Sequence, residues 1–257
     1  MSRIDALLEC ILTLERPLLL ALDVDGTLAP VVRDPDLAQI PEQTLSTLAA
    51  LAEAPMLEVA LVTGRDLSAL RRMERLDGIW RAVEHGRVVL APGQAPPRNA
   101  LTSEQREALD RFGHWVDGHA QGAFIEYKPQ AIAVHVRGIA EVDPGRANRL
   151  LREVDEVAQN LGLHVRRGKA LREAELVLHD KGNALREIFE RSGVKSVFFV
   201  GDDVTDFSAI DFAAEHGLGA FVHSAEQRCT PAKPAALLQS VQEVAALLSR
   251  LSQRIAG

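Results

Sequence analysis

The sequence predicts an α/β protein whose core is a doubly wound parallel sheet and which carries a smaller α+β domain inserted into that core. Two observations predict this organisation. Near both ends of the chain, short continuous apolar runs alternate with segments of helical spacing, the pattern of a parallel sheet covered by helices on both faces. In the middle, a stretch rich in proline and glycine at residues 91–99 precedes segments in the order helix, strand, strand, which occurs twice.

The composition is that of a folded chain without the features of a nucleic-acid-binding protein. Of its 257 residues, 47% are hydrophobic and 25% are charged, which excludes a disordered protein. The 29 Lys and Arg residues against 36 Asp and Glu give a net charge of −7. With two Trp, one Tyr and eight Phe, the chain is also poor in the aromatic side chains on which bases stack. The sequence gives no evidence of an obligate protein partner.

The cysteines and the N-terminal segment predict the cellular location. Cys10 and Cys229 are too few for a metal cluster and do not indicate a disulfide scaffold, so we expect a reducing compartment. Residues 1–15 contain three acids and have the pattern of an amphipathic helix rather than a signal peptide. The apolar run at residues 18–22 is far shorter than the roughly 20 residues of a membrane span. We therefore expect a cytoplasmic protein with no membrane partner.

The elements of the core follow from apolar runs and from the spacing of leucines. Short, largely apolar runs predict buried strands, and leucines three residues apart predict helices. The core strands are expected at residues 17–22, 57–62, 80–84, 196–200 and 218–222. The core helices are expected within residues 1–15 and at 43–53, 67–75, 183–191, 207–215 and 241–255.

The inserted domain is expected to occupy residues 101–178, so that residues 1–100 and 179–257 form the core. Its helices are predicted at residues 103–119 and 144–160. Strands are predicted at residues 123–128 and 131–137, and two more within 163–178. The segments at residues 91–99 and 178–180 connect the two parts and are candidate hinges.

Two carboxylates follow the first predicted strand. Asp23 and Asp25 come directly after residues 17–22, and ligands of open α/β sheets bind at the carboxyl ends of the strands. Gly26 allows a sharp turn at this point. An aspartate can attack phosphorus as a covalent nucleophile, and a second carboxyl group can protonate the leaving oxygen and then activate water. The alternative is that both acids are solvated loop residues or a helix N-cap.

Two further segments could contact a phosphate. Thr63 and Gly64 lie at the end of the second strand and before a helix, where a hydroxyl and a backbone N–H form an anion cradle. Lys181 lies just before another helix and can pair with phosphate oxygens or with a carboxylate. Each signal is weak by itself, because Thr-Gly is a common turn and an exposed lysine is usually solvated.

An acidic loop follows the strand at residues 196–200. Asp202, Asp203 and Asp206 lie within five positions, and their mutual repulsion is relieved by a hard cation such as Mg²⁺. A solvated acidic loop that caps the next helix is a reasonable alternative for Asp206, but it explains the whole set poorly.

The four elements occur in the order of the haloacid dehalogenase superfamily of phosphotransferases, which the chain resembles. The resemblance implies a Rossmann-like core with an inserted α/β cap of the superfamily's large class. It implies that Asp23 forms an aspartyl-phosphate and that Asp25 is the acid and base. It also implies that Thr63, Gly64 and Lys181 hold the phosphoryl oxygens. The implied Mg²⁺ ligands are Asp23, the backbone carbonyl of Asp25 and Asp202, with Asp203 and Asp206 in support.

Segments of the insertion make the chain similar to the trehalose-6-phosphate phosphatases within that superfamily. The matching segments are residues 34–36, 84–86 (Glu-His-Gly), 125–128 (Ile-Glu-Tyr-Lys), 133–137 (Ala-Val-His-Val-Arg), 168–173 (Gly-Lys-Ala-Leu-Arg-Glu) and 201–206. The resemblance implies that the substrate-binding residues are Arg65, His85, Glu126, Lys128, His135, Arg137 and Glu173.

An argument from strand geometry supports the residues of the insertion. Side chains alternate between the two faces of a strand, so Glu126 and Lys128 are expected on one face of a strand, and His135 and Arg137 on one face of the next. With Glu173, these side chains supply the paired donors and acceptors that a disaccharide requires. The alternative is a set of cross-strand ion pairs on a solvated face, worth about 0.2–1 kcal/mol each.

Three positions depart from the family pattern. The family has Arg and Pro soon after the glutamate of the insertion, where this chain has Glu175 and Leu176. Phe207 replaces an acid that follows the acidic loop. These departures leave the core motifs intact and bear on substrate specificity.

Other functions remain open at this point. One is a related phosphatase acting on a sucrose- or mannosylglycerate-type phosphate, and another is a phosphosugar mutase with the same core. A more remote alternative is a signalling receiver that is phosphorylated on an aspartate. A receiver needs neither a general acid at Asp25 nor a large inserted domain, so both features argue against it.

Overall fold

The computed structural model describes residues 2–32, 37–96, 101–128, 130–168, 170–176, 179–223 and 231–256. Residues 34–36, Lys169 and Cys229, which the sequence analysis singles out, lie outside these ranges, as does the end of the segment at 91–99. The chain divides into two compact units, one of Met1–Pro96 with His179–Gly257 and one of Pro97–Leu178. In the part of the chain that is described, no helix combines the length and the apolarity that crossing a bilayer requires.

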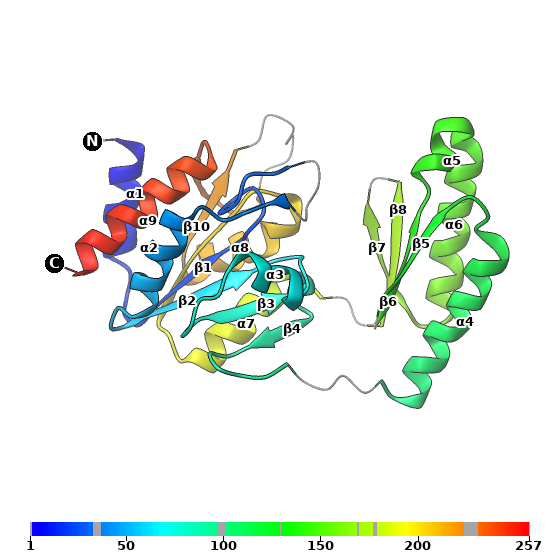
Figure 1. Ribbon diagram of the computed structural model, residues 1–257, viewed down its shortest axis with the longest axis horizontal. Coiled ribbons are helices and arrows are strands. Elements are labelled where there is room, and N and C mark those ends of the chain that lie inside the picture. Colours follow the sequence, from blue (N-terminus) through cyan, green and yellow to red (C-terminus); the bar gives the residue numbers. More distant parts are fainter. Residues whose placement is uncertain are drawn as a thin grey trace. The chain divides into compact units, whose positions relative to one another are not determined.

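The first unit, called the core unit below, is built on a seven-stranded sheet in the order β11-β10-β9-β1-β2-β3-β4 (Figure 1). All neighbouring pairs are parallel except β3 and β4, which are antiparallel. The strands are β1 (Leu18–Leu22), β2 (Leu57–Val62), β3 (Trp80–Val83), β4 (Val88–Leu90), β9 (Ser196–Gly201), β10 (Gly217–Val222) and β11 (Ala236–Leu238).

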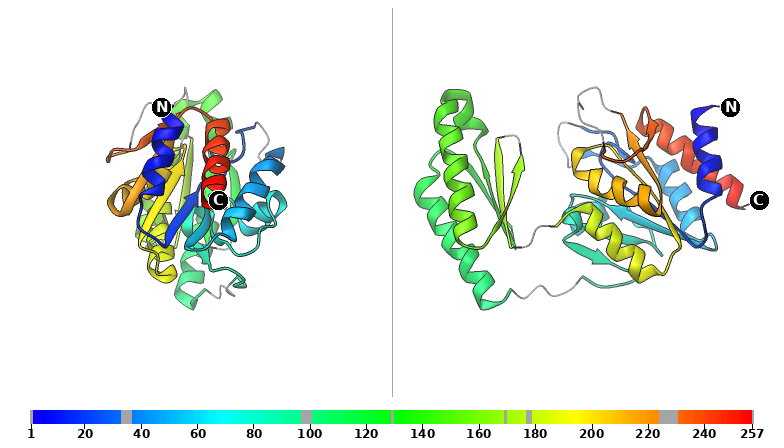
Figure 2. Two further views of the ribbon diagram at one scale, coloured as in Figure 1. Left: turned by 90° about the vertical axis from the view of Figure 1, so that its left-hand side faces the viewer. Right: turned by 180° about the vertical axis from the view of Figure 1, so that it is seen from behind.

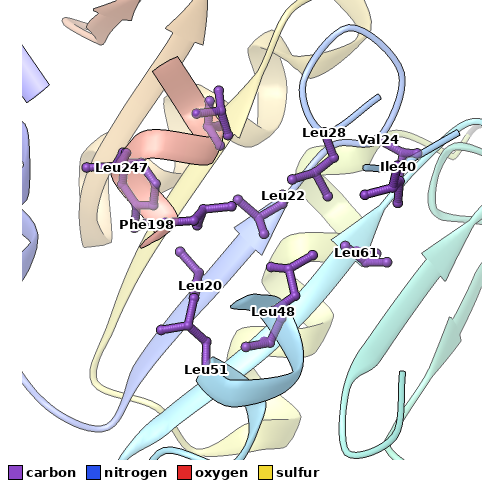
Figure 3. Packing of buried hydrophobic residues seen from close by; sticks show 14 of the residues in the cluster. Leu20, Leu22, Val24, Leu28, Ile40, Leu48, Leu51, Leu61, Phe198 and Leu247 are labelled. Atoms are coloured by element: carbon purple, nitrogen blue, oxygen red, sulfur yellow. The ribbon is translucent and has the colours of Figure 1, made fainter. Parts of the chain in front are cut away.

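Helices cover both faces of this sheet, which explains why most residues of its strands are apolar and buried. On β1, Leu18, Leu20 and Leu22 pack on one face against α1, α2, α3 and α9 (Figure 3). Leu19 and Ala21 belong to the cluster on the other face, with residues of α7 and α8, and these two helices cover that face of the sheet (Figure 2, right). The helices are α1 (Arg3–Leu12), α2 (Glu42–Ala52), α3 (Leu67–Met73), α7 (Lys181–Ser192), α8 (Phe207–His216) and α9 (Val241–Ala256).

Two edge strands, β4 and β11, are missing from the sequence-based expectations. Each has three residues, too few for a period to be recognised. They form because neighbouring strands already present unpaired backbone groups, a condition that is set by the tertiary structure.

The second unit, called the inserted unit below, is an antiparallel sheet in the order β5-β6-β8-β7. Helices α4 and α6 pack against one of its faces through a separate apolar cluster. The opposite face carries Glu126, Lys128, Glu173 and Glu175, whereas Arg167 and Arg172 lie on the helix-covered face and pair with Asp155 of α6. The elements are α4 (Ser103–His119), β5 (Phe124–Lys128), β6 (Ala131–His135), α5 (Arg137–Val142), α6 (Pro144–Asn160), β7 (His164–Gly168) and β8 (Leu171–Glu175).

The predicted strand at residues 131–137 is too long, and the prediction that Arg137 shares a strand face with His135 is wrong. The strand ends at His135, and Arg137 begins α5. Val136 keeps one bond in register with β8, from its N–H to the carbonyl of Ala170, but its dihedrals are no longer extended. Valine at 134 and 136 suggested a continued period of two, but burial of Ile139 on the short helix determines the backbone path.

Candidate active site

The polar residues predicted from the sequence gather at the carboxyl edge of the core sheet. Asp23 follows β1, Thr63 follows β2 and Asp202 follows β9, and these three strands are parallel neighbours. Their ends surround a cavity of about 360 Å³. The cavity is lined by Asp23, Asp25, Val31, Val32, Ala38, Thr63, Gly64, Arg65, His85, Lys181, Asp202, Asp203 and Thr205.

A buried cation joins two buried carboxylates at the floor of this cavity. The Nζ of Lys181 lies 2.6 Å from Asp23 Oδ1 and 2.6 Å from Asp206 Oδ1. All three side chains are buried. Burial, and then the charge of Asp206, raise the pKa of Asp23 well above its usual value, and Lys181 opposes this rise. Burial lowers the pKa of Lys181, but the two carboxylates outweigh it and raise the net value, so the lysine stays charged.

Three carboxylates in this cluster could hold a metal ion. Oxygens of Asp23, Asp202 and Asp206 all lie within 4.8 Å of one another. Burial, and then the charge of Asp206, raise the pKa of Asp202 to about 7. Two buried carboxylates and a half-buried one that faces the cavity offer the oxygen ligands that a hard divalent cation prefers. The donor chemistry therefore fits Mg²⁺, which the sequence resemblance implies.

Gly26 brings two of the predicted segments together. It has a φ of +82°, and a Cβ at this position would lie 2.0 Å from Oδ2 of Asp202. The turn after Asp25 therefore requires glycine both for its backbone conformation and for the close approach of the acidic loop. This contact places the loop that carries Asp202 beside the loop that carries Asp23.

Asp206 has two functions in the structure. Its Oδ1 accepts a hydrogen bond from Lys181, and its Oδ2 accepts the backbone N–H groups of Asp202 and Asp203. It thereby fixes the acidic loop and also belongs to the group of potential metal ligands. Asp203 lines the cavity but is not in the group of potential metal ligands, which consists of Asp23, Asp202 and Asp206 among the described residues.

Arg65 makes a contact that the sequence does not indicate. Its Nε lies 2.6 Å from Asp25 Oδ2 and its Nη2 lies 2.7 Å from Asp25 Oδ1. This two-pronged pair holds the carboxylate of Asp25 in one orientation. The two residues are 40 positions apart, and only the pairing of β1 with β2 brings them together, so no local pattern could have revealed the contact.

Four of the five residues predicted for substrate binding in the inserted unit lie together on the open face of its sheet. Lys128 Nζ is 2.6 Å from Glu173 Oε1 and 3.9 Å from Glu126 Oε2. His135 Nε2 is 3.4 Å from Glu126 Oε2. Arg137, on α5, is not part of this chain of contacts as far as the described residues show.

Glu175, one of the departures from the family pattern, has a partner on the same face. Its carboxylate accepts a hydrogen bond of 2.6 Å from Nε of Arg166 on the neighbouring strand β7. Glu175 is buried, so its negative charge is compensated within the sheet rather than left isolated. The charge inversion at position 175 therefore comes with a cation supplied by the next strand.

The single tyrosine of the chain provides a spectroscopic test of the inserted unit. The hydroxyl of Tyr127 donates a 2.6 Å hydrogen bond to Asp117 Oδ1 on α4. This bond, with burial and the charge of Asp117, raises the pKa of Tyr127 to about 12. At about pH 11 we expect roughly a tenth of the tyrosinate absorbance, compared with roughly nine tenths for a tyrosine of ordinary pKa near 10.

The Asp117→Ala variant should recover that ordinary titration, measured by near-ultraviolet absorbance between pH 9 and 12 (about the range that separates the two cases). Circular dichroism at each pH serves as the control for alkaline unfolding. Equal midpoints in the two proteins, both folded, would contradict the hydrogen bond.

The chain matches a known family over most of its length. A family model described as trehalose-phosphatase matches residues 21–235. The trehalose-phosphate phosphatase of Mycobacterium ulcerans is 29% identical over 254 residues, covering 95% of this chain and 63% of that protein. An uncharacterized glycosyl hydrolase of Mycobacterium tuberculosis is 33% identical over 231 residues, covering 85% of this chain and 17% of that protein. The chain thus spans less than two thirds of either curated relative.

Solved structures with the same fold span nearly the whole chain. The trehalose-6-phosphate phosphatase of Aspergillus fumigatus superposes with a TM-score of 0.76 at 25% sequence identity, covering 99% of this chain and 98% of that chain. The C-terminal domain of the trehalose-6-phosphate phosphatase of Candida albicans superposes with a TM-score of 0.71 at 22% identity, covering 98% and 97%. The second likeness concerns the fold alone.

Proposed function

Because the chain belongs to the trehalose-phosphatase family, we propose that it is a phosphatase that converts trehalose 6-phosphate and water to trehalose and inorganic phosphate. The observation that carries the proposal is the buried contact of Asp23 with Lys181 beside a group of three carboxylates. A nucleophilic carboxylate, a fixed cation and a potential metal site at one sheet edge are the requirements of phosphoryl transfer through an aspartate.

Asp23 is the proposed nucleophile. In the first step its carboxylate oxygen bonds to phosphorus while the bond between phosphorus and the sugar oxygen breaks, which leaves an aspartyl-phosphate. The contact with Lys181, at 2.6 Å, fixes the direction of this carboxylate. Thr63, Gly64 and Lys181 are proposed to hold the phosphoryl oxygens, where fixed donors stabilise the charge of the transition state.

Asp25 is the proposed general acid and base. It gives a proton to the departing sugar oxygen and later takes one from water, whose oxygen bonds to phosphorus as the bond to Asp23 breaks and phosphate leaves. Arg65 and Asp25 both line the cavity, and their pair holds the carboxylate of Asp25 in one orientation there, which supports this role.

A divalent cation is the proposed cofactor. Asp23, the backbone carbonyl of Asp25 and Asp202 are proposed to hold Mg²⁺, with Asp203 and Asp206 in support. When bound, the cation supplies the positive charge that allows an anionic carboxylate to approach a phosphate dianion.

The open face of the inserted sheet is proposed to read the sugar. Glu126, Lys128, His135 and Glu173 alternate donors and acceptors along it, which suits the hydroxyl groups of a disaccharide. We propose that Arg65, which lines the cavity of the core unit beside His85, also contacts or positions the substrate. Arg137, given its place on α5, has no such role in this proposal.

Replacing Glu126 with alanine should separate sugar recognition from chemistry. We expect kcat/KM for trehalose 6-phosphate to fall about 10–100-fold, because a site built to bond hydroxyls loses one partner. Hydrolysis of a small aryl phosphate should stay within about threefold of the wild-type rate, since that ester has no sugar. Equal losses on both esters, measured by phosphate release, would contradict a specificity role for this face. Glu141→Ala, on α5, is a matched control.

Phosphate release from a panel of esters tests the proposed function itself. The panel contains trehalose 6-phosphate, sucrose 6-phosphate, glucose 6-phosphate and an aryl phosphate, each assayed with Mg²⁺ and with chelator. Metal-dependent release with a large preference for trehalose 6-phosphate supports the whole proposal. Metal-dependent release with another preference keeps the mechanism and discards the substrate. Isomerisation of a phosphosugar without release would indicate a mutase.

A further inference from the structure

A strained turn lies between two of the segments that line the cavity. It consists of Glu84, His85 and Gly86, between β3 and β4. All three residues have positive φ values, of 55°, 57° and 96°. Two successive non-glycine residues in the left-handed region are uncommon and persist only where the surroundings hold them, most often at functional sites.

Main-chain contacts hold this turn against both neighbouring segments. The N–H of His85 donates to the carbonyl of Thr63 at 2.9 Å, and the N–H of Glu84 donates to the carbonyl of Arg65 at 2.8 Å. On its other side, a Cβ at Gly86 would lie 2.7 Å from the carbonyl oxygen of Asp180. The turn is therefore fitted between the Thr-Gly-Arg loop and the start of α7, the two segments proposed to hold phosphate.

The ring of His85 covers Gly64. A Cβ at Gly64 would lie 2.5 Å from Cε1, 2.6 Å from Nε2 and 3.2 Å from Nδ1 of His85, and these are the three nearest atoms. Gly64 does not have the positive φ that would itself exclude a side chain. The imidazole ring, rather than the backbone conformation, is what leaves no space for a methyl group at position 64.

We propose that His85 is a positioning residue: its ring, fixed by the strained turn, sets the place of Gly64 and so of the backbone that faces the phosphoryl group. This rests on the proposed function for the identity of the ligand. It differs from a direct role in sugar binding, in which the imidazole would bond the substrate. Small displacements matter here, because a misplacement of about 1 Å can cost roughly 100-fold in rate.

A double-variant experiment distinguishes the two roles. Gly64→Ala should lower kcat/KM for an aryl phosphate about 100-fold, because the methyl group and the ring cannot occupy the same place. Adding His85→Ala should raise kcat/KM at least about tenfold above that of Gly64→Ala, since the smaller side chain removes the clash. A double variant that is no more active than Gly64→Ala would overturn the proposal, because it would mean that His85 acts on the substrate itself.

A second measurement applies even where Gly64→Ala fails to fold. Binding of vanadate, which mimics the transferring phosphoryl group, is measured from its effect on thermal unfolding of the whole chain. His85→Ala should weaken binding about tenfold, whereas His85→Phe, which keeps a flat ring over Gly64, should stay within about threefold of wild type. Equal weakening in both variants, or none in either, would overturn the proposal. Replacement of His114, on α4, is the control.

The two hypotheses fail in different ways. Absence of phosphate release from every ester by the wild-type chain would refute the proposed function, while vanadate binding would still report on His85. Normal wild-type turnover without rescue in the double variant would refute the positioning role alone.

Discussion

Asp23→Asn is expected to abolish phosphate release while leaving the fold intact. The amide cannot form the bond to phosphorus, so the rate should fall by roughly 10⁴-fold or more, as for other essential nucleophiles. The side chain is buried and isosteric with asparagine, and its oxygen can still accept the bond from Lys181. Removing its charge also reduces the repulsion with Asp202 and Asp206 that raises the pKa of Asp23. Thermal unfolding in chelator should therefore be unchanged or shifted upward.

Single-turnover assays with trehalose 6-phosphate and with an aryl phosphate would measure the loss. Asp211→Asn is a matched control, because Asp211, on α8, accepts a hydrogen bond from the backbone N–H of Lys233 and is not among the residues that line the cavity. A normal kcat in Asp23→Asn would remove this residue from the role of nucleophile, whatever the effect on KM.

Lys181→Met is expected to damage both stability and activity. Methionine has a similar length but no charge, so Asp23 and Asp206 would remain buried without the cation that lies 2.6 Å from each. Breaking one partner out of a buried ion pair typically costs about 3–5 kcal/mol. Loss of a fixed donor to the phosphoryl group should also lower kcat by about 10²–10³-fold. Denaturant unfolding in chelator and phosphate release would measure the two effects separately.

The double variant Lys181→Met with Asp206→Asn tests the reason for the lost stability. Asparagine at 206 removes one uncompensated charge and can still accept the N–H groups of Asp202 and Asp203. We expect it to recover part of the free energy of unfolding but none of the activity. If the Lys181→Met variant were as stable as the wild-type protein, the electrostatic account of this cluster would be contradicted.

Local patterns predicted most of the core because its elements are determined by local periodicity. The strands at residues 18–22 and 57–62 are apolar on both faces, and each ends at a polar residue. The carboxyl ends of parallel strands meet at one edge of a sheet. Once these strands are recognised as parallel, little further information is needed to place Asp23, Thr63 and Asp202 together. The edge strands β4 and β11 escaped because three residues carry no recognisable period.

In the inserted unit, the period of two correctly placed Glu126 and Lys128 on one face of β5, and it failed at Arg137. A period of two describes a strand only while the strand lasts. The end of β6 coincides with the start of α5, which buries Ile139 in the apolar cluster of this unit, and that packing is not visible in residues 131–137.

The sequence by itself determined the fold class, the family and the loops that carry the candidate chemistry, because each depends on residue type and spacing within a short segment. Only the tertiary structure decided which charges meet. Lys181 lies 158 positions from Asp23, and Arg65 pairs with Asp25 across two strands. His85 reaches Gly64 through a turn held by main-chain bonds. Such contacts depend on strand order, register and close packing, which bring together residues that no local pattern relates.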